Sequence, residues 1–201
     1  MKEDKVKDRI LSAARDLFVK NGYDGTSVRD IADASGANVA HIKYYFQSKG
    51  HLFEIIFEES LDTLIKQIFP IIESDMPIFD LVEAWITAYY DLLPKYPQIP
   101  IFVINEMNHN PDKLAALVKK YSPERVILTL DKRFKMEYKK GTIKKIPAVD
   151  FALNVLSLSI FPFIFGRLVV KVSGVDPEFY RAILKRHKKY VVRSILDSLK
   201  P

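Results

Sequence analysis

Apolar residues recur at intervals of three and four along almost the whole chain, and this spacing constrains the fold more than any other feature. Such a period places apolar side chains on one face of an α-helix, whereas a half-buried strand would show strict alternation. Glycine, which weakens helix interiors, occurs only 7 times in 201 residues. The sequence therefore predicts an all-α protein.

Capping residues and prolines give the expected ends of the helices. The first helix should run from about Lys5 to Lys20, because Asn21-Gly22 is a natural stop. Two short helices follow, one after Gly25-Thr26-Ser27 and one from Asn38 to Phe46, and Ser48 caps a longer fourth helix. Later helices are expected at about 79–93, 99–108, 123–140, 147–172 and 177–199.

The two short helices form a helix-turn-helix pattern, with Gly36 in the joint. The helical period turns Val39, Ile42 and Phe46 inward and Tyr45 partly inward. The outward residues are Ala40, His41, Lys43, Tyr44 and Gln47. A small residue permits close approach to a groove, donors suit base edges, and a cation and phenols suit phosphates. The pattern favours DNA binding over its alternative, an ordinary three-helix core with one surface helix.

A longer series of residues narrows the class of protein. It comprises Ile10-Leu11-x-Ala13-Ala14-x-x-Leu17-Phe18, Gly22-Tyr23-x-Gly25-Thr26-Ser27-Val28-Arg29-Asp30-Ile31-Ala32, Ser35-Gly36, Tyr44-Tyr45-Phe46-x-Ser48-Lys49 and Leu52-Phe53. In this order the residues resemble the DNA-binding domain of the TetR family of transcriptional regulators. The resemblance implies that the helix from Asn38 to Phe46 is the recognition helix, that Thr26 caps the helix before it, and that Lys49 holds a phosphate.

The candidate DNA-binding residues all lie in this segment: Thr26, Asn38, Ala40, His41, Lys43, Tyr44, Tyr45 and Lys49. We expect Asn38 and His41 at or near base edges, and Lys43, Tyr44 and Lys49 at phosphates. For Tyr45, packing and a phosphate contact both stay open. Many family members carry Tyr where this sequence has Lys43, so an operator sequence cannot be borrowed from relatives.

The resemblance also implies how the chain is organised. We expect a helix-turn-helix DNA-binding domain at residues 1–50 and a larger helical domain for ligand binding and dimerisation at residues 51–201. In TetR-like proteins the last two helices pack against their twins in a four-helix dimer interface. Apolar residues cover nearly the whole circumference of segment 148–172, so it should be buried on more than one side. A homodimer implies a palindromic double-stranded DNA operator, because two recognition helices must enter grooves about 34–36 Å apart.

An unknown small-molecule effector is implied for the larger domain, where it would release a repressor from DNA. The candidate ligand-binding residues are Trp85, Tyr89, Asn105, Glu106, His109, Phe161 and Phe165. Apolar walls with a few polar groups are what such a site needs. Aromatic residues at helical spacing are equally typical of a core, and that alternative stays open.

Other functional classes have less support. Glu106-x-x-His109 has the spacing found twice in di-iron helical bundles, but it occurs once here, so a helical-bundle enzyme or metal-binding protein is the alternative. The chain has no cysteine, no His-Glu-x-x-His and no glycine-rich phosphate loop. We therefore expect no enzymatic activity, no cofactor and no metal.

Charge and hydropathy suggest where the protein works. The absence of cysteine and the charged start MKEDKVKDR argue for the cytoplasm and against a signal peptide. The uncharged run from Phe151 to Gly166 is shorter than the roughly 20 residues that span a bilayer, which favours a core or interface helix and no membrane. The net charge is +6, and residues 181–201 are strongly basic. We interpret the basic excesses of the chain as solvated helix faces, with binding of the basic final helix to a membrane surface as an alternative.

Overall fold

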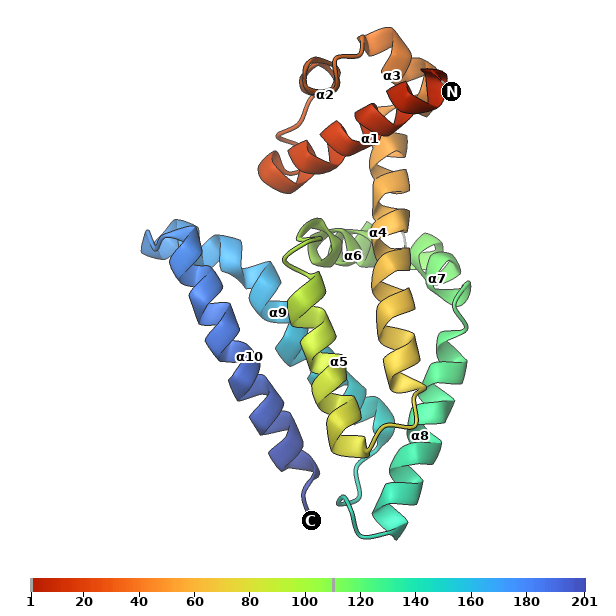
Figure 1. Ribbon diagram of the computed structural model, residues 1–201, viewed down its shortest axis with the longest axis vertical. Coiled ribbons are helices and arrows are strands. Elements are labelled where there is room, and N and C mark those ends of the chain that lie inside the picture. Colours follow the sequence, from red (N-terminus) through yellow and green to blue (C-terminus); the bar gives the residue numbers. More distant parts are fainter. Residues whose placement is uncertain (1, 110) are drawn as a thin grey trace. The chain divides into compact units, whose positions relative to one another are not determined.

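The computed structural model describes residues 2–109 and 111–201, except for the side chains at positions 2–4, 98, 102, 105, 106, 109, 113 and 167. These described residues form ten α-helices and no strand, so the all-α prediction is confirmed (Figure 1). The helices are α1 (Lys2–Asn21), α2 (Val28–Ser35), α3 (Val39–Phe46), α4 (Lys49–Ile72), α5 (Ile78–Leu92), α6 (Gln98–His109), α7 (Pro111–Lys119), α8 (Pro123–Lys139), α9 (Ala148–Ser173) and α10 (Pro177–Leu199).

The helix boundaries agree with the sequence-based expectation except at one element. The sequence analysis predicts no helix over α7, which is nine residues long and begins at Pro111. Proline is tolerated at a first helical position because its missing N–H has no partner there in any case. A helix of nine residues is shorter than the window of about 11–18 residues in which helical periodicity is recognised, which is why it was missed.

Contacts divide the chain into two compact units. Unit 1 comprises Met1–Thr63 and Tyr96–Phe102, and unit 2 comprises Leu64–Lys95 and Val103–Pro201. The predicted domain boundary after residue 50 stays a prediction.

The core of unit 1 lies among α1, α2, α3 and the first half of α4. Its fully or almost fully buried side chains are Ile10, Ala14, Phe18, Ile31, Ala32, Ile42, Phe46, Leu52 and Ile56. Burying each large apolar side chain contributes about 1.5–3 kcal/mol, so this cluster is the main source of stability for the two short helices α2 and α3. One inward prediction is wrong: Val39 is 45% exposed, because the first turn of α3 precedes its core contacts, which begin at Ile42.

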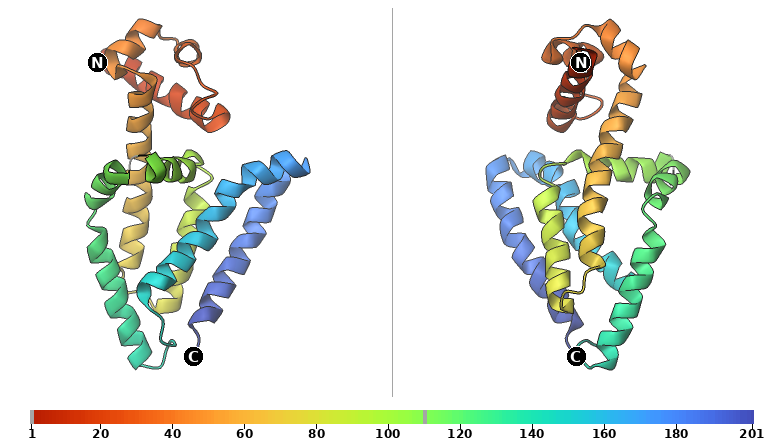
Figure 2. Two further views of the ribbon diagram at one scale, coloured as in Figure 1. Left: turned by 180° about the vertical axis from the view of Figure 1, so that it is seen from behind. Right: turned by 45° about the vertical axis from the view of Figure 1, so that its right-hand side comes forward.

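In unit 2, α5, α9 and α10 pack against one another and α8 packs against α9. Figure 2 shows that α9 and α10 meet at a short connection and diverge away from it. A Cβ at Gly166 of α9 would overlap the ring of Tyr180 of α10. The Tyr180 hydroxyl donates a hydrogen bond of 2.8 Å to the carbonyl oxygen of Pro162, so this ring lies directly on the α9 backbone. Glycine at position 166 is what permits that approach.

Helix α9 is buried along one side and exposed along the other. Its buried residues include Phe151, Val155 and Ser159. Its exposed large apolar residues are Val149, Leu153, Leu158, Phe161, Phe165, Leu168 and Val172, which we call the α9 apolar face. The prediction that this helix is buried on more than one side is therefore not met within a single chain.

The same helix corrects a second expectation. Within α9, the stretch Ala148–Gly166 has 19 residues with a mean hydropathy of 1.9, of which 22% are buried. By length and composition alone it could cross a membrane, and it is the one described helix that could, so the length of the uncharged run does not by itself exclude a span. The apolar window extends past Asp150, where the sequence analysis stopped counting. Helices of soluble proteins also pass this test, so it is weak evidence for a membrane.

Candidate nucleic-acid interface

The turn that places α3 is fixed by hydrogen bonds at both ends of α2. At its start, the Asp30 N–H donates to Ser27 Oγ (3.1 Å) and the Ser27 N–H donates to Asp30 Oδ2 (2.7 Å), a capping box. These bonds hold the pKa of the Asp30 carboxyl below its usual value. At its end, Gly36 has a left-handed backbone (φ 63°) and its N–H points back to the carbonyl groups of Ala32 and Asp33. Glycine suits this conformation, so the predicted role of Gly36 in the joint is confirmed.

Thr26 is part of the interior of unit 1. It is 1% exposed, and its hydroxyl donates to the carbonyl oxygens of Gly22 (2.8 Å) and Leu17 (3.2 Å). The residue that caps α2 is Ser27, so the prediction that Thr26 is the cap is wrong. Because its hydroxyl is turned inward, Thr26 offers DNA no side-chain group, and we remove it from the candidate contacts.

Helix α3 presents its polar residues on one face. Asn38 caps it, with Oδ1 accepting a 2.7 Å bond from the His41 N–H, as predicted. Ile42 and Phe46 are buried at 1% and 0% exposure, whereas Tyr44 is 76% exposed. The other outward residues of the prediction, Ala40, His41, Lys43 and Gln47, are exposed too, as is Asn38. This side of α3 therefore forms a continuous exposed face, which we call the α3 polar face.

Tyr45 lies at the edge of the α3 polar face. It is half-buried, and its ring centroid lies 5.1 Å from that of Tyr44 and 6.3 Å from that of Phe46. These contacts support packing without excluding a phosphate contact, so both interpretations of Tyr45 stay open.

Lys49, predicted to hold a phosphate, has partners within unit 1. Its Nζ donates to the carbonyl oxygens of Tyr23 and Thr26, at 3.0 Å each, and lies 4.0 Å from the centroid of the Tyr23 ring. The Tyr23 ring in turn lies 4.9 Å from that of Phe53 in α4. Lys49 thus ties the connection between α1 and α2 to the start of α4. Sequence patterns do not reveal this role, because both acceptors are backbone groups.

Two of the predicted ligand-binding residues lie in the interior of unit 2. Trp85 and Tyr89 of α5 are 3% and 6% exposed. Burial raises the pKa of Tyr89 to about 12, slightly opposed by the indole N–H of Trp85, although the two groups do not meet the geometry of a hydrogen bond. The indole Nε1 of Trp85 and the hydroxyl of Ser159 are buried, and among the described residues neither has a partner. Buried donors without partners are costly, so they suit a site that a ligand completes.

The remaining predicted ligand-binding residues are placed differently. Phe161 and Phe165 of α9 are 57% and 42% exposed and stack on each other, with centroids 5.5 Å apart and ring planes at 16°. They belong to the α9 apolar face and not to the interior. The side chains of Asn105, Glu106 and His109 lie outside the described residues. Among the residues that are described, no three His, Cys, Asp or Glu side chains gather as metal ligands would.

A polar contact that the sequence analysis missed links α5 to α10. Tyr90 Oη and His187 Nδ1 are 2.6 Å apart, and the Tyr90 ring makes an edge contact with Phe163 of α9 at 5.4 Å. Burial raises the pKa of Tyr90 to about 12 and lowers that of His187. At neutral pH the pair is therefore a protonated phenol and a neutral imidazole. Partners 97 positions apart leave no sequence signal.

Known proteins share this arrangement. A family model described as "Bacterial regulatory proteins, tetR family" matches residues 10–56. "Probable HTH-type transcriptional regulator YttP" of Bacillus subtilis is 26% identical over 195 residues, covering 92% of this chain and 91% of YttP. RutR, an HTH-type transcriptional regulator of Escherichia coli, is 31% identical over 101 residues, which span 50% of this chain and 47% of RutR.

Solved structures share the fold across almost the whole chain. The TetR family regulator PfmR of Thermus thermophilus has a TM-score of 0.66 at 18% identity, covering 92% of this chain and 97% of PfmR. A TetR/AcrR family regulator of Thermobifida fusca has a TM-score of 0.64 at 18% identity, covering 94% and 97% of the two chains.

A capped helix pair joined at a left-handed glycine, with the α3 polar face exposed on its second helix, defines a helix-turn-helix DNA-binding protein that regulates transcription. The match over residues 10–56 narrows this class to one family, and the arrangement of the remaining helices agrees with it. Residues 10–56 belong to the TetR family of bacterial regulatory proteins, and the chain as a whole has the fold of TetR-family transcriptional regulators. This family is not enzymatic, so the helical-bundle enzyme is set aside.

The position of Lys49 leads to a prediction about stability. Lys49→Ala removes two hydrogen bonds and the cation over Tyr23, so we expect unit 1 to lose about 1 kcal/mol of stability. Hydrogen exchange of the backbone amides of α1 and α2 measures this. Lys20→Ala, an exposed lysine near the end of α1, is the matched control. Unchanged exchange in Lys49→Ala would restrict Lys49 to a role on DNA.

The Tyr90–His187 contact leads to a prediction about pH. Because the pKa of His187 is lowered on folding, the unfolded chain binds a proton more readily. The stability that this site contributes is present above the ordinary histidine pKa of 6.5 and is lost as the pH falls through the lower folded value. Urea unfolding between about pH 7.5 and pH 5 should therefore show a steeper loss of stability in the native chain than in His187→Phe. His41→Gln is the control for loss of an exposed imidazole; equal slopes for native chain and His187→Phe would contradict the prediction.

Proposed function

We propose that this protein is a homodimeric repressor that binds a palindromic operator through α3 and is released from it by a small molecule bound in unit 2. The observation that carries the proposal is the α3 polar face. Ile42 and Phe46 fix the orientation of the helix from its buried side, so the opposite side is held rigidly outward. A regulator of this kind works in the cytoplasm, where its operator is.

The α3 polar face offers a division of tasks on DNA. His41 and Asn38, in the first turn of α3 and at its cap, suit base edges, because the start of a recognition helix points into the major groove. Lys43 and Tyr44 suit phosphates, the first as a point charge and the second as a phenol donor. Ala40 leaves room for close approach. Lys49 would contact a phosphate either in addition to its two carbonyl partners or in exchange for them.

The α9 apolar face supports dimerisation. A large exposed apolar surface on a soluble protein usually marks an interface, and here it lies on one helix with Phe161 and Phe165 stacked near its middle. A second copy of the chain that covers this face with its own α9 would supply the burial that a single chain lacks. The dimer would also place two α3 helices on the two halves of one operator.

The effector site is proposed in the interior of unit 2, beside Trp85 and Tyr89. The indole N–H of Trp85 and the hydroxyl of Ser159, each buried without a partner among the described residues, are groups that a bound ligand would satisfy. Helix α4 continues unbroken from unit 1 into unit 2 and is a physical route for coupling. Because coupling is reciprocal, DNA must weaken effector binding by the factor by which the effector weakens DNA binding.

DNA contacts are tested with an operator selected from random sequences and fluorescence anisotropy over a range of salt. We expect Lys43→Ala to weaken binding to all sequences and to reduce the slope of log affinity against log salt by about 1 per bound copy. His41→Ala should instead cost about 1–3 kcal/mol on the selected operator and change the preferred base at one position per half-site. Lys145→Ala, an exposed lysine of unit 2, is the control. A native protein whose DNA binding does not depend on salt refutes the proposal.

Dimerisation is tested by placing a charge on the α9 apolar face. Phe161→Glu should convert a dimer into a monomer in analytical ultracentrifugation while circular dichroism stays unchanged, because the side chain is 57% exposed in one chain. Leu128→Glu, at 59% exposure on α8, places the same charge outside this face and should leave the dimer intact. If the native protein is monomeric, or if Phe161→Glu stays dimeric, the α9 face is not the interface.

A further inference from the structure

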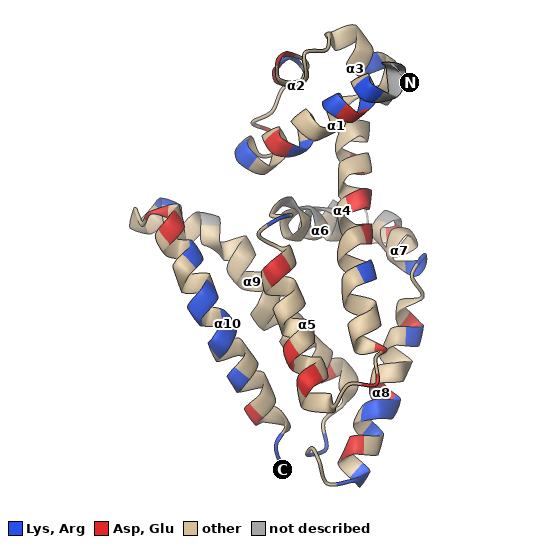
Figure 3. Ribbon diagram, viewed as in Figure 1, with Lys and Arg blue, Asp and Glu red and all other residues tan. Residues whose placement is uncertain are grey.

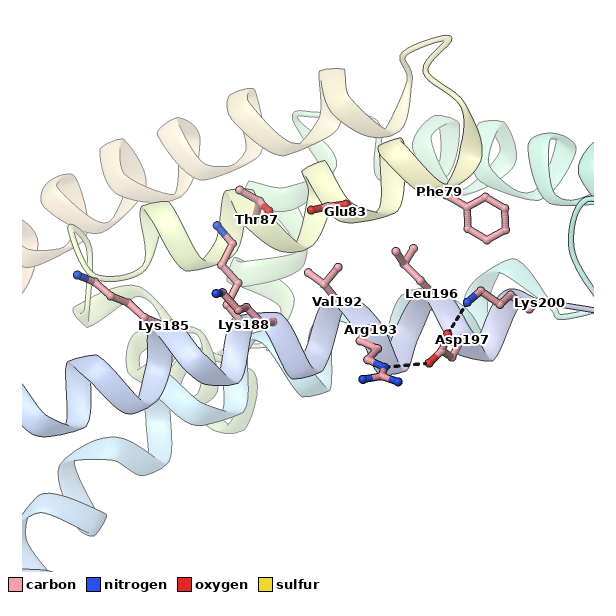
Figure 4. Close-up of a pocket in the computed structure, with 11 residues that line it drawn as sticks. Phe79, Glu83, Thr87, Lys185, Lys188, Val192, Arg193, Leu196, Asp197 and Lys200 are labelled. Atoms are coloured by element: carbon pink, nitrogen blue, oxygen red, sulfur yellow. Dashed lines mark hydrogen bonds and ion pairs between the residues drawn. The ribbon is translucent and has the colours of Figure 1, made fainter.

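A groove of about 890 Å³ runs between α5 and α10 within unit 2. Figure 3 shows basic residues following one another along α10, and Figure 4 shows the side chains that line the groove. We propose that this groove binds a free organic anion with a carboxylate or phosphate head and a short apolar body. The proposal goes beyond DNA binding and the interior effector site, and it holds whether or not the anion changes DNA affinity.

The first argument is uncompensated charge. Five cations line the groove, against two carboxylates, Glu83 and Asp197. Asp197 is already engaged, at 2.7 Å from Lys200 and 3.7 Å from Arg193. Within the described part of the chain, Lys185 and Lys189 make no ion pair. Clustered cations along one wall of a groove create a positive potential that attracts an anion.

The second argument is the apolar part of the lining. Val192 and Leu196 of α10 point toward α5, and Phe79 lies near the first turn of α5 (Figure 4). All three are half-buried. An inorganic ion would leave these surfaces in water, whereas an apolar body would cover them. The groove volume is also that of a small-molecule site, which is about 300–1,000 Å³.

The order of residues along α10 sets the orientation of the ligand. Lys185, Lys188 and Lys189 lie near the middle of α10, and Val192 and Leu196 follow toward its end at helical spacing on the same side. Lys188 also forms an ion pair of 3.4 Å with Asp91 of α5. An anionic head placed there would compete with Asp91 for Lys188, and at this distance the ion pair is weak. From Lys188 to Leu196 the helix rises about 12 Å, which is enough for a body of about eight carbons. The head should therefore lie at the lysine end.

The experiment uses the full chain and three matched probes in isothermal titration calorimetry at low salt. Octyl phosphate carries both features, octanol lacks the charge, and inorganic phosphate lacks the body. We expect octyl phosphate to bind at least about tenfold more tightly than either of the others and to weaken as salt is added. Octanoate should behave like octyl phosphate.

Two variants with the same change in charge locate the site. Lys185→Gln with Lys189→Gln should weaken octyl phosphate by about tenfold, whereas Lys132→Gln with Lys145→Gln, two exposed lysines outside the groove, should change it by less than about twofold. All four side chains are on the surface, so both variants should fold, which circular dichroism verifies.

Several results would overturn the proposal. Equal binding of octanol and octyl phosphate would show apolar adsorption, and equal loss in both variants would show general charge attraction. Binding to phosphatidylglycerol vesicles without binding to octyl phosphate would assign the groove to a membrane surface. A change of oligomeric state in Lys185→Gln with Lys189→Gln, seen by light scattering, would assign it to a second copy of the chain.

Discussion

Burial of Ile42 and Phe46 in the core of unit 1 is the contact on which the use of α3 depends. An eight-residue helix has little stability of its own, so its position comes from tertiary packing. Once these two side chains are fixed against α1, α2 and α4, the helical period leaves no choice about which residues face outward. The α3 polar face is thus a consequence of the core. Any change that loosens the core also makes the positions of the outward side chains less well defined.

Lys49 shows that a residue expected to contact DNA also has a structural role in unit 1. Its ammonium group donates hydrogen bonds to two carbonyl oxygens at the connection between α1 and α2 and lies over an aromatic ring. A cation at this position stabilises the connection between α1 and α2 whether or not DNA is present. Assigning Lys49 to a phosphate alone overlooks this structural part. The two roles are separable in principle, since stability reports one and salt dependence of DNA affinity reports the other.

The sequence allowed the fold to be predicted almost helix by helix, because the fold depends on local signals: apolar period, caps and prolines. It also placed Gly36, Asn38 and the outward residues of α3 correctly, because a glycine in a tight joint, a capping side chain and the period of one short helix are all local signals. Prediction from the sequence failed for features that depend on contacts between residues far apart in the chain. The inward hydroxyl of Thr26, the carbonyl partners of Lys49 and the Tyr90–His187 contact depend on segments brought together by folding. Composition alone could not separate the exposed and buried sides of α9.

Unit 2 carries two different surfaces on its last two helices, and their chemistry argues for two different partners. The α9 apolar face consists of large apolar side chains and suits a surface of the same kind, which a second copy provides. The groove between α5 and α10 is lined by cations. A second apolar face placed over them would remove their water without supplying a counter-ion, which costs free energy. A dimer built on α9 would therefore leave the α5–α10 groove open to water. A small anion can occupy that groove without displacing the dimer contact, and by bridging α5 and α10 it would stiffen the helix pair to which α9 is anchored through Tyr180.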